Sequence, residues 1–281
     1  MDAVFLINKE VGWTSFDLCA KLRKKFDTKK VGHTGTLDPF AEGLMILTLG
    51  KNTKIIPFLE DLDKEYIAEL KLGEETDTLD KTGEIIETLP VPSLTNNEVE
   101  DVLKSFLGKQ KQLPPMYSAL KRNGIPLYEL ARNGIEVERE EREIEILDIK
   151  LISFENYIIK FSSSVSKGTY IRSLAKDIAL KLNTTGHLIS LKRTRVGSFY
   201  LKDAKKVFDV EASDSVSLNV LLPHIEHVKV NDFGVTRVKN GMRLKFNTDS
   251  KLVLVKSYED EVLAIYERRE EGIYYTKRGL F

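Results

Sequence analysis

A glycine-rich loop near the N-terminus holds the first carboxylate that could do chemistry. Residues 32–43 read Gly-His-Thr-Gly-Thr-Leu-Asp-Pro-Phe-Ala-Glu-Gly, and an apolar run follows them. The glycines and small polar residues let the backbone turn tightly and approach a ligand closely. Pro39 fixes its own φ angle and biases Asp38 toward an extended conformation. A carboxylate held on such a loop can act as a nucleophile or a base, and the alternative is an Asp-Pro turn at the surface.

A second segment supplies a cation that needs an anionic partner. Residues 166–174 read Ser-Lys-Gly-Thr-Tyr-Ile-Arg-Ser-Leu, and Gly168 with Thr169 suits the start of a helix. Arg172 would then lie in the first helical turn, where a cation is disfavoured by about 0.3–1 kcal/mol. The partner could be a surface carboxylate, in a pair worth about 0–1 kcal/mol. It could instead be a buried catalytic carboxylate, which the arginine would orient and keep ionised.

Other motifs for chemistry are missing from the sequence. Residues 32–43 match neither the P-loop pattern nor Gly-x-Gly-x-x-Gly, which argues against a phosphate-binding loop. No Gly-x-Ser-x-Gly elbow surrounds Ser162–Ser164, so a polar strand edge is expected there. Cys19 is the only cysteine, which excludes a disulfide within the chain and a cysteine metal cluster. His224 and His227 lack the further ligands that would complete a metal site.

The charge is distributed unevenly along the chain. The formal net charge is +0, yet residues 160–206 hold 11 Lys and Arg against 2 Asp. Residues 60–104 hold 4 Lys against 14 Asp and Glu. Because salt screens charges beyond about 8–10 Å, a polyanion responds to the local patch rather than to the total charge. The separation of sign is compatible with an anionic partner, although each run alone is also typical of a solvated face.

Composition and hydropathy indicate an ordinary globular protein. The 281 residues are 42% hydrophobic and 31% charged, which is enough for one large domain and one small one. No apolar run of about 18 residues predicts a transmembrane helix, and the N-terminus lacks the pattern of a signal peptide. We therefore expect a cytoplasmic protein of a bacterium or an organelle.

Hydrophobic periodicity predicts the elements that must position Asp38 and Arg172. Apolar residues that alternate or run continuously predict strands, and apolar residues at helical spacing predict helices. The last part of the chain, about 228–281, is strand-like throughout, so we place a domain boundary near 226 and expect an α+β protein with a small β appendage. The strands are expected over 3–8, 44–49, 64–72, 144–154, 157–165, 187–196, 252–255, 262–266 and 273–276, and the helices over 16–26, 96–107 and 170–182.

Two of the predicted helices have a defined apolar face. Thr14 or Ser15 can cap the first helix, and Pro114–Pro115 stops the chain from continuing the second. The residues expected to face inward are Phe16, Leu18, Cys19, Leu22 and Phe26 in the first helix, and Val99, Val102, Leu103, Phe106 and Leu107 in the second.

Seven segments, taken together, resemble the tRNA pseudouridine synthase B (TruB) family of the bacterial, stand-alone type. Beside the glycine-rich loop they include Leu-Ile-Asn-Lys-Glu-Val-Gly-Trp-Thr-Ser-Phe, Thr-Asp-Thr-Leu-Asp-Lys-Thr-Gly-Glu and Gln-Leu-Pro-Pro-Met-Tyr-Ser-Ala-Leu-Lys. In order and spacing they cover roughly residues 4–200. The segments lie at 6–16, 32–43, 63–66, 76–84, 112–121, 167–174 and 191–195.

The resemblance implies an isomerase that converts the uridine at tRNA position 55, in the T arm, to pseudouridine. The target base must leave its stack to be reached, and nothing is added or removed overall, so no cofactor and no metal are implied. Asp38 matches the family's catalytic aspartate, Arg172 the arginine paired with it, and Tyr66 the tyrosine that stacks on the base. His33 matches the histidine that supports the flipped nucleotide, and Lys9 matches a lysine that supports the catalytic loop. Tyr170 and the backbone near Leu191 match positions that contact the uracil.

The resemblance also implies an architecture and a partner. A pseudouridine synthase catalytic domain, with a mixed, largely antiparallel sheet and flanking helices, would span 1–226 and include an RNA-gripping insert at about 64–145. A PUA-like RNA-binding domain would span 227–281, although a β domain that merely packs on the core is the alternative. The expected partner is the T-arm stem-loop of tRNA, without an obligate protein partner or a membrane, and the chain is expected to be a monomer. Residues expected near the RNA backbone are Lys109, Lys111, Lys121, Arg122, Arg132, Lys167, Lys192 and Arg193.

Two other functions stay open at this point. One is an RNA-binding protein that assists tRNA folding without chemistry, against which the intact Asp38, Tyr66 and Arg172 argue. The other is a pseudouridine synthase with a different RNA target, and conversion of an isolated T-arm stem-loop would distinguish the two enzymes.

Overall fold

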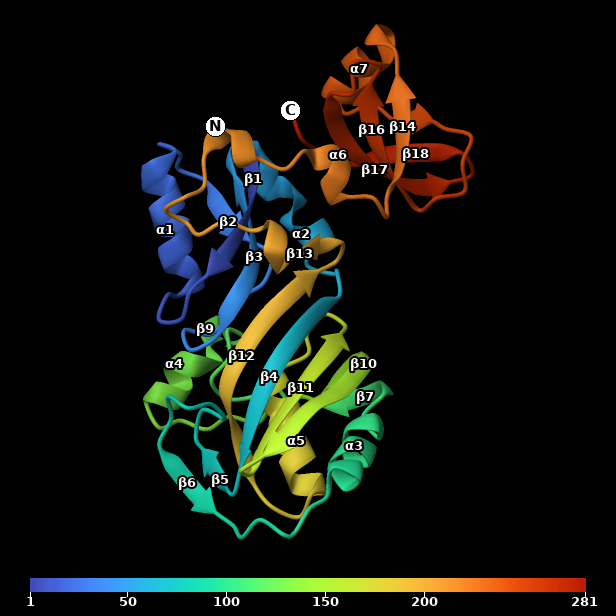
Figure 1. Ribbon diagram of the computed structural model, residues 1–281. Coiled ribbons are helices and arrows are strands. Elements are labelled where there is room, and N and C mark those ends of the chain that lie inside the picture. The colour runs from blue at the N-terminus through green and yellow to red at the C-terminus, as the bar shows by residue number, and fades with distance from the viewer.

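One large and one small β-sheet form the frame of the molecule (Figure 1). The computed structural model describes residues 1–281. Across the large sheet the strands follow the order β1 (Ala3–Lys9), β3 (Glu42–Leu49), β12 (Gly186–Val196), β4 (Lys64–Leu72), β11 (Ile158–Val165), β10 (Arg142–Glu155) and β7 (Gly108–Gln112), while β2 (Val31–His33) pairs with β3 and β13 (Phe199–Tyr200) with β12. Within this sheet β12 and β3 are the only neighbours that pair in parallel. The α+β class and the largely antiparallel sheet are therefore confirmed.

The central strand β4 shows why the sequence forms this sheet. Every second residue from Lys64 to Leu72 is buried, as the alternation predicts. Tyr66 lies opposite Arg193 of β12 on one side and opposite Ser163 of β11 on the other. Side chains of opposed residues point to the same face of a sheet. Tyr66 and Arg193 therefore share the face on which the helices pack.

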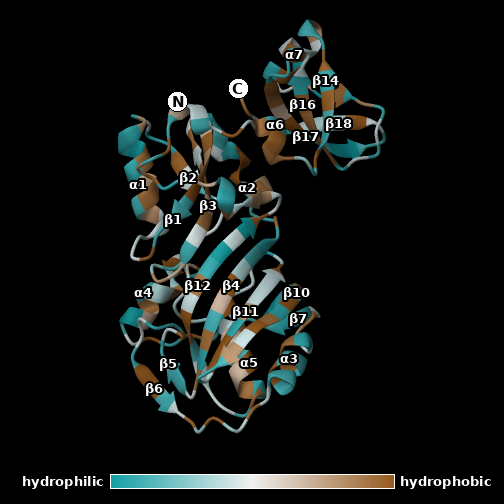
Figure 2. Cartoon of the chain, viewed as in Figure 1, coloured by the Kyte–Doolittle hydropathy of each residue, from teal (hydrophilic) through white to brown (hydrophobic).

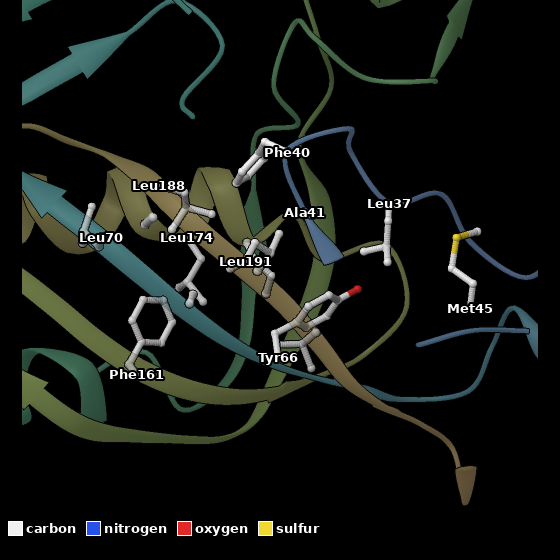
Figure 3. Close-up of a cluster of buried hydrophobic side chains, with 14 of the residues drawn as sticks. Leu37, Phe40, Ala41, Met45, Tyr66, Leu70, Phe161, Leu174, Leu188 and Leu191 are labelled. Carbon is white, nitrogen blue, oxygen red and sulfur yellow. The ribbon is translucent and has the colours of Figure 1, made fainter. Parts of the chain in front are cut away.

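Helices cover the inner face of the large sheet. Helix α5 (Ile171–Lys181) contacts β12 and β4, and α3 (Asn96–Lys104) contacts β10 and α5. The core that forms between them contains Leu70, Phe161, Leu174 and Leu188, close to Tyr66 and Leu191 (Figure 3). The remaining helices are α1 (Ser15–Lys25), α2 (Ile56–Leu59), α4 (Leu127–Arg132), α6 (Leu218–Leu221) and α7 (Asp232–Lys239), with 3-10 turns at Gly50–Ile55, Leu201–Asp203 and Ala212–Asp214.

The helix ends follow their capping residues, but two side chains lie differently from the prediction. Thr14 caps α1 in a capping box with Asp17. Phe16 was expected to face inward and is instead 72% exposed, because it stands in the first turn beside His33 rather than over the sheet. Leu107 is also exposed, because α3 ends at Lys104 and the chain has left the helix before residue 107.

Short hairpins interrupt the region between β4 and β10. A first pair joins β5 (Glu74–Thr76) to β6 (Ile85–Thr88), and neither strand was predicted. A second pair joins β8 (Lys121–Arg122) to β9 (Ile125–Pro126). Strands of two to four residues carry too little periodicity to be predicted from the sequence.

The C-terminal sheet has the order β14 (Glu226–Val230), β16 (Leu252–Ser257), β17 (Val262–Glu270), β18 (Ile273–Gly279) and β15 (Leu244–Lys245). The expectation of an all-strand tail is wrong at α7, which Asn231 caps and Asp232 begins. Gly234 and the β-branched Val235, Thr236 and Val238 are weak helix formers and led to the strand prediction, whereas the cap at Asn231 indicated the helix.

The small sheet is joined to the large one by a shared apolar core. Figure 2 shows hydrophobic residues along β16 and β17, and among them Leu254 and Ile265 pack with Leu44 and Ile46 of β3. Lys54 Nζ also donates to the carbonyl oxygen of Gly279 at 2.9 Å. No helix in the structure is long and apolar enough to span a membrane.

Gly43 allows β3 and β12 to approach each other, and its replacement tests that contact. A Cβ at Gly43, whose φ is +114°, would lie 2.3 Å from the backbone oxygen of Arg193. We expect Gly43→Ala to lower the free energy of unfolding by about 2–5 kcal/mol. Gly12→Ala is the matched control, because Gly12 has φ +89° and nothing within 4 Å of its Cβ position. Urea denaturation should show the larger loss for Gly43→Ala, and equal losses would contradict the close approach.

Candidate active site

The loop between β2 and β3 places Asp38 at the edge of the core. Ser15, at the start of α1, accepts a hydrogen bond from the Leu37 amide at 3.0 Å and donates to the Leu37 carbonyl at 3.3 Å. The Ala41 amide donates to the Asp38 carbonyl at 3.1 Å, and the Gly12 amide to the Pro39 carbonyl at 2.8 Å. The loop is thus fastened on both sides of Asp38.

A buried lysine, Lys9, binds backbone carbonyls of the same loop and of the segment before α1. The Lys9 ammonium donates to the carbonyl oxygens of Trp13 and Ala41, both at 2.6 Å, with longer contacts to those of Glu10 and Pro39. Burial lowers the pKa of Lys9 to about 8. The prediction that Lys9 supports the loop stays a functional proposal, and its contacts are those that such a role requires.

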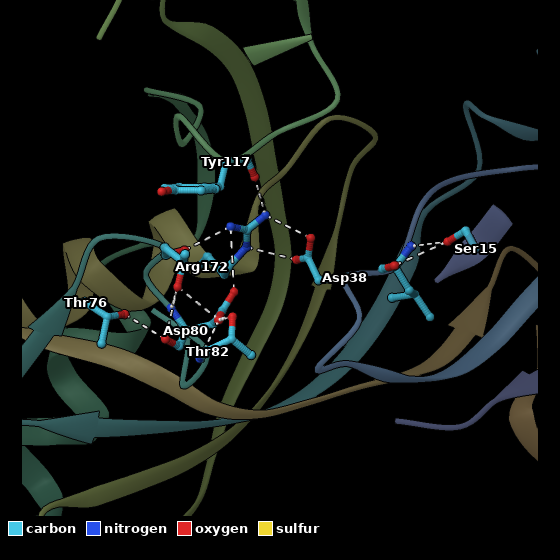
Figure 4. Close-up of polar contacts among 9 residues, drawn as sticks. Ser15, Asp38, Thr76, Asp80, Thr82, Tyr117 and Arg172 are labelled. Carbon is cyan, nitrogen blue, oxygen red and sulfur yellow. Dashed lines mark hydrogen bonds and ion pairs between the residues drawn. The ribbon is translucent and has the colours of Figure 1, made fainter. Parts of the chain in front are cut away.

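Arg172 binds the Asp38 carboxylate with two parallel hydrogen bonds. Its Nε lies 2.9 Å from Oδ2 and its Nη2 lies 3.0 Å from Oδ1 (Figure 4). Arg172 is also bonded to the carbonyl oxygens of Thr78 at 2.9 Å and Tyr117 at 2.7 Å. A bidentate, charge-assisted pair fixes the direction of a carboxylate as well as its charge.

Asp80 is a second carboxylate on Arg172 that the sequence interpretation missed. Its Oδ2 lies 3.8 Å from Arg172 Nη1, and both side chains are 5% exposed. Asp80 Oδ1 accepts from the Thr82 amide at 2.9 Å and from the hydroxyls of Thr82 and Thr78. The Thr-Asp-Thr-Leu-Asp-Lys-Thr-Gly run carried the signal, because Asp flanked by Thr forms such local hydrogen bonds.

The groups around Asp38 shift the pKa of its carboxyl in opposite directions. Burial raises the pKa of the Asp38 carboxyl more than the Arg172 guanidinium lowers it, and the Asp80 carboxylate adds to the rise. The Asp38 side chain nevertheless remains 32% exposed, so a substrate can reach it. Arg172 is therefore the group that favours the ionised form of a carboxyl whose environment favours the neutral one.

A cavity of about 610 Å³ opens in front of Asp38, within the usual range of about 300–1,000 Å³ for small-molecule sites. Tyr66, Tyr170 and Leu191 line it together with Asp38 and Arg172. Burial raises the pKa of Tyr170, so its phenol is a hydrogen-bond donor at neutral pH. Tyr66 and Leu191 lie next to each other beneath the loop (Figure 3).

His33 stands outside this cavity. Its Nδ1 accepts from the Gly35 amide at 3.3 Å, and its ring meets the exposed Phe16 edge-on with the centroids 6.1 Å apart. Burial lowers the pKa of His33, so the ring is neutral at neutral pH. This aromatic pair therefore precedes the loop that begins at Thr34 and does not line the cavity.

The basic residues predicted at the RNA backbone lie in different environments. Lys167, at the cavity rim, pairs with Asp61 at 2.6 Å, and Lys192 pairs with Glu42 at 2.8 Å. A place at the RNA backbone was predicted for Arg193, which assumed that it lies on the surface. Arg193 is instead 2% exposed, and its guanidinium donates to backbone carbonyls. None of the residues expected at the RNA backbone from the predicted insert lines the cavity around Asp38: Lys109, Lys111, Lys121, Arg122 and Arg132.

Removing the charge of Arg172 should shift the titration of Asp38. We expect Arg172→Met to raise the pKa of the Asp38 carboxyl further, because burial and Asp80 then act without the opposing cation. The measurement is the carbon-13 NMR titration of the Asp38 carboxyl in the parent and the variant. Lys167→Met, which removes another cation at the cavity, is the control and should leave that titration in place. An unchanged Asp38 titration in Arg172→Met would contradict this account of the pair.

Comparison with known proteins shows the family to which this chain belongs. A model described as the TruB family pseudouridylate synthase N-terminal domain matches residues 23–171. A tRNA pseudouridine synthase B from Hydrogenovibrio crunogenus is 42% identical over 264 residues, which cover 93% of this chain and 87% of the relative. Another, from Dehalococcoides mccartyi, is 38% identical over 288 residues, which cover 99% of this chain and 96% of the relative.

A solved structure supports the fold over nearly the whole chain. The crystal structure of a Cbf5-Nop10-Gar1 complex contains a chain with TM-score 0.76 and 23% identity, covering 99% of this chain and 85% of that one. The likeness includes the C-terminal sheet. With the family model, the curated relatives and this fold in agreement, the chain belongs to the TruB family of pseudouridylate synthases.

Proposed function

We propose that this pseudouridine synthase isomerises the uridine at position 55 of tRNA, in the T arm, with Asp38 as the nucleophile. The observation that carries the proposal is the carboxylate of Asp38, bound bidentately by Arg172 and facing a cavity of about 610 Å³. The names of the relatives, tRNA pseudouridine synthase B, support tRNA as the substrate.

The proposed reaction needs an ionised carboxylate and a binding site, because the product is an isomer. The bond from ribose C1′ to uracil N1 breaks, the base turns, and C1′ forms a bond to C5. N1 gains a proton and C5 loses one, so atoms and electrons balance. Addition to the ring, attack on the sugar and formation of a glycal all begin from ionised Asp38, which is the form that Arg172 favours.

The cavity suits a single base taken out of its stack. A flipped base loses its stacking neighbours, and an aromatic platform offsets this cost by about 1–3 kcal/mol. We assign that platform to Tyr66, with Tyr170 and Leu191 against the uracil and Lys9 holding the loop. His33, beside the exposed Phe16, would support the nucleotide at the mouth of the site.

The RNA grip is proposed to involve both the insert and the small sheet. Residues 1–226 would form the catalytic domain with its insert at about 64–145, and residues 227–281 a PUA-like RNA-binding domain. In the latter, the exposed Phe233 ring lies 5.8 Å from the Arg237 guanidinium, a combination on which RNA bases can stack. The shared core would hold this surface at a constant distance from Asp38.

Release of tritium from tRNA labelled at uracil C5 tests the reaction. We expect the parent to release about one equivalent from the labelled target uridine, and Asp38→Asn to be slower by at least about 10³-fold, because the amide is no nucleophile. Asp63→Asn is the matched control, since Asp63 is exposed and does not line the cavity. It should release tritium at close to the parent rate.

The remaining outcomes separate the rival functions. A folded parent that binds the transcript but releases no tritium would contradict the proposed reaction and favour an RNA-binding protein. Release that persists after position 55 is changed from uridine to cytidine would place the target elsewhere. Conversion of the isolated T-arm stem-loop is expected, because the cavity accepts one nucleotide and the arm presents it in a loop.

A further inference from the structure

Two buried cations in the cavity have no carboxylate partner. Lys64 is 8% exposed and Arg193 is 2% exposed, and both line the cavity in front of Asp38. Neither forms a salt bridge, and their hydrogen bonds go to backbone carbonyls only. Buried charges are normally paired. These two are therefore an exception that calls for an anion.

The two cations lie on the same face of adjacent strands. Arg193 of β12 is the direct register partner of Tyr66 on β4, and Lys64 precedes Tyr66 by two residues on the same face. Both therefore flank the tyrosine to which we assign the target base. An anion between them would lie next to the target nucleotide.

Donors without a full set of partners line the same cavity. Lys64 Nζ donates only to the Glu60 carbonyl at 2.6 Å. Arg193 uses Nε for Leu44 and Nη2 for Gly35, which leaves Nη1 without a partner. The hydroxyl of Thr34, which also lines the cavity, is buried without a hydrogen-bond partner. An oxyanion with several acceptor oxygens can satisfy three such donors at once.

The nearby acidic groups do not neutralise the pair. Burial, and after it the charge on Arg193, lower the pKa of Lys64 to about 8, against the smaller opposing effects of Asp61, Asp63 and Glu60. Asp61 is already bound to Lys167. Inside the cavity, therefore, no carboxylate is bound to Lys64 or to Arg193.

We propose that Lys64, Arg193 and Thr34 form a subsite for one phosphodiester of the RNA backbone adjoining the target uridine. The proposal rests on the proposed function, since it places this phosphate beside the base held by Tyr66. It differs from surface contacts of the basic residues, because a desolvated subsite would recognise a single linkage. The phosphate would set the register of the strand and thereby select which nucleotide reaches Asp38.

A scan with neutral linkages tests the subsite. T-arm stem-loops would carry one methylphosphonate at a time on either side of the target uridine. Binding would be measured to protein with Asp38→Asn, so that the RNA is held without conversion. We expect one linkage whose neutralisation weakens binding by about tenfold or more, with little effect from the others.

Variants of the subsite identify that linkage by coupling. Lys64→Met and Thr34→Val should each weaken binding of the unmodified RNA, and the neutral linkage should cost them little more. Lys64→Arg keeps the charge and should restore sensitivity to the linkage. Lys150→Met is the control, because Lys150 is exposed on β10 and paired with Asp148. It should retain the parent's full sensitivity, and thermal unfolding would verify that each variant is folded.

Three results would overturn the subsite. One is a folded Lys64→Met variant whose binding affinity falls as much with every neutral linkage as that of the Lys150→Met control. Another is a scan in which no single linkage stands out. The third is stabilisation of the parent by inorganic phosphate without any effect of the linkages, which would assign the site to a free anion. Tritium release by the parent is measured separately, so the subsite can fail while the proposed reaction stands.

Discussion

The bidentate ion pair between Asp38 and Arg172 is the contact on which the rest of the site depends. It joins the loop before β3 to the first turn of α5, while the same guanidinium binds the Thr78 and Tyr117 carbonyls. Segments far apart in the sequence therefore meet at one planar group. Because Arg172 is buried, loss of any of these acceptors would leave charge or donors unsatisfied, at a cost of about 1–3 kcal/mol for each unsatisfied group. The fold and the orientation of the Asp38 carboxylate are thus linked through a single side chain.

A second constraint acts from beneath the loop. Lys9 and Arg193 bind carbonyl oxygens on both sides of Asp38, at Ala41 for the first and at Gly35 and Leu44 for the second. These carbonyls must point inward, which leaves the Asp38 side chain directed toward the cavity. The resulting excess of buried positive charge offsets the free-energy cost of desolvating a carboxylate. The same excess is compatible with a polyanionic substrate.

Much of this arrangement could be predicted from the sequence, and the remainder depended on tertiary contacts. The alternation of Lys64–Leu72 and the helical spacing after Tyr170 predicted β4 and α5 correctly, because one face of each is buried. The interior position of Arg193 could not be predicted, since its partners are backbone carbonyls, which leave no pattern in side chains. Asp80 was missed for a related reason: the run around it indicates only its local hydrogen bonds to Thr78 and Thr82, and not its contact with the distant Arg172. The helix α7 was missed because β-branched residues outweighed its capping residue.

A double-mutant cycle on kcat/KM tests most directly whether Asp38 and Arg172 act as one unit. The four proteins are the parent, Asp38→Asn, Arg172→Met and the double variant, assayed with the same tRNA transcript. The account predicts that the double variant is no slower than the slower single variant, because each change already removes the oriented, ionised carboxylate. Losses that multiply in the double variant would contradict it, since Arg172 would then contribute independently of Asp38.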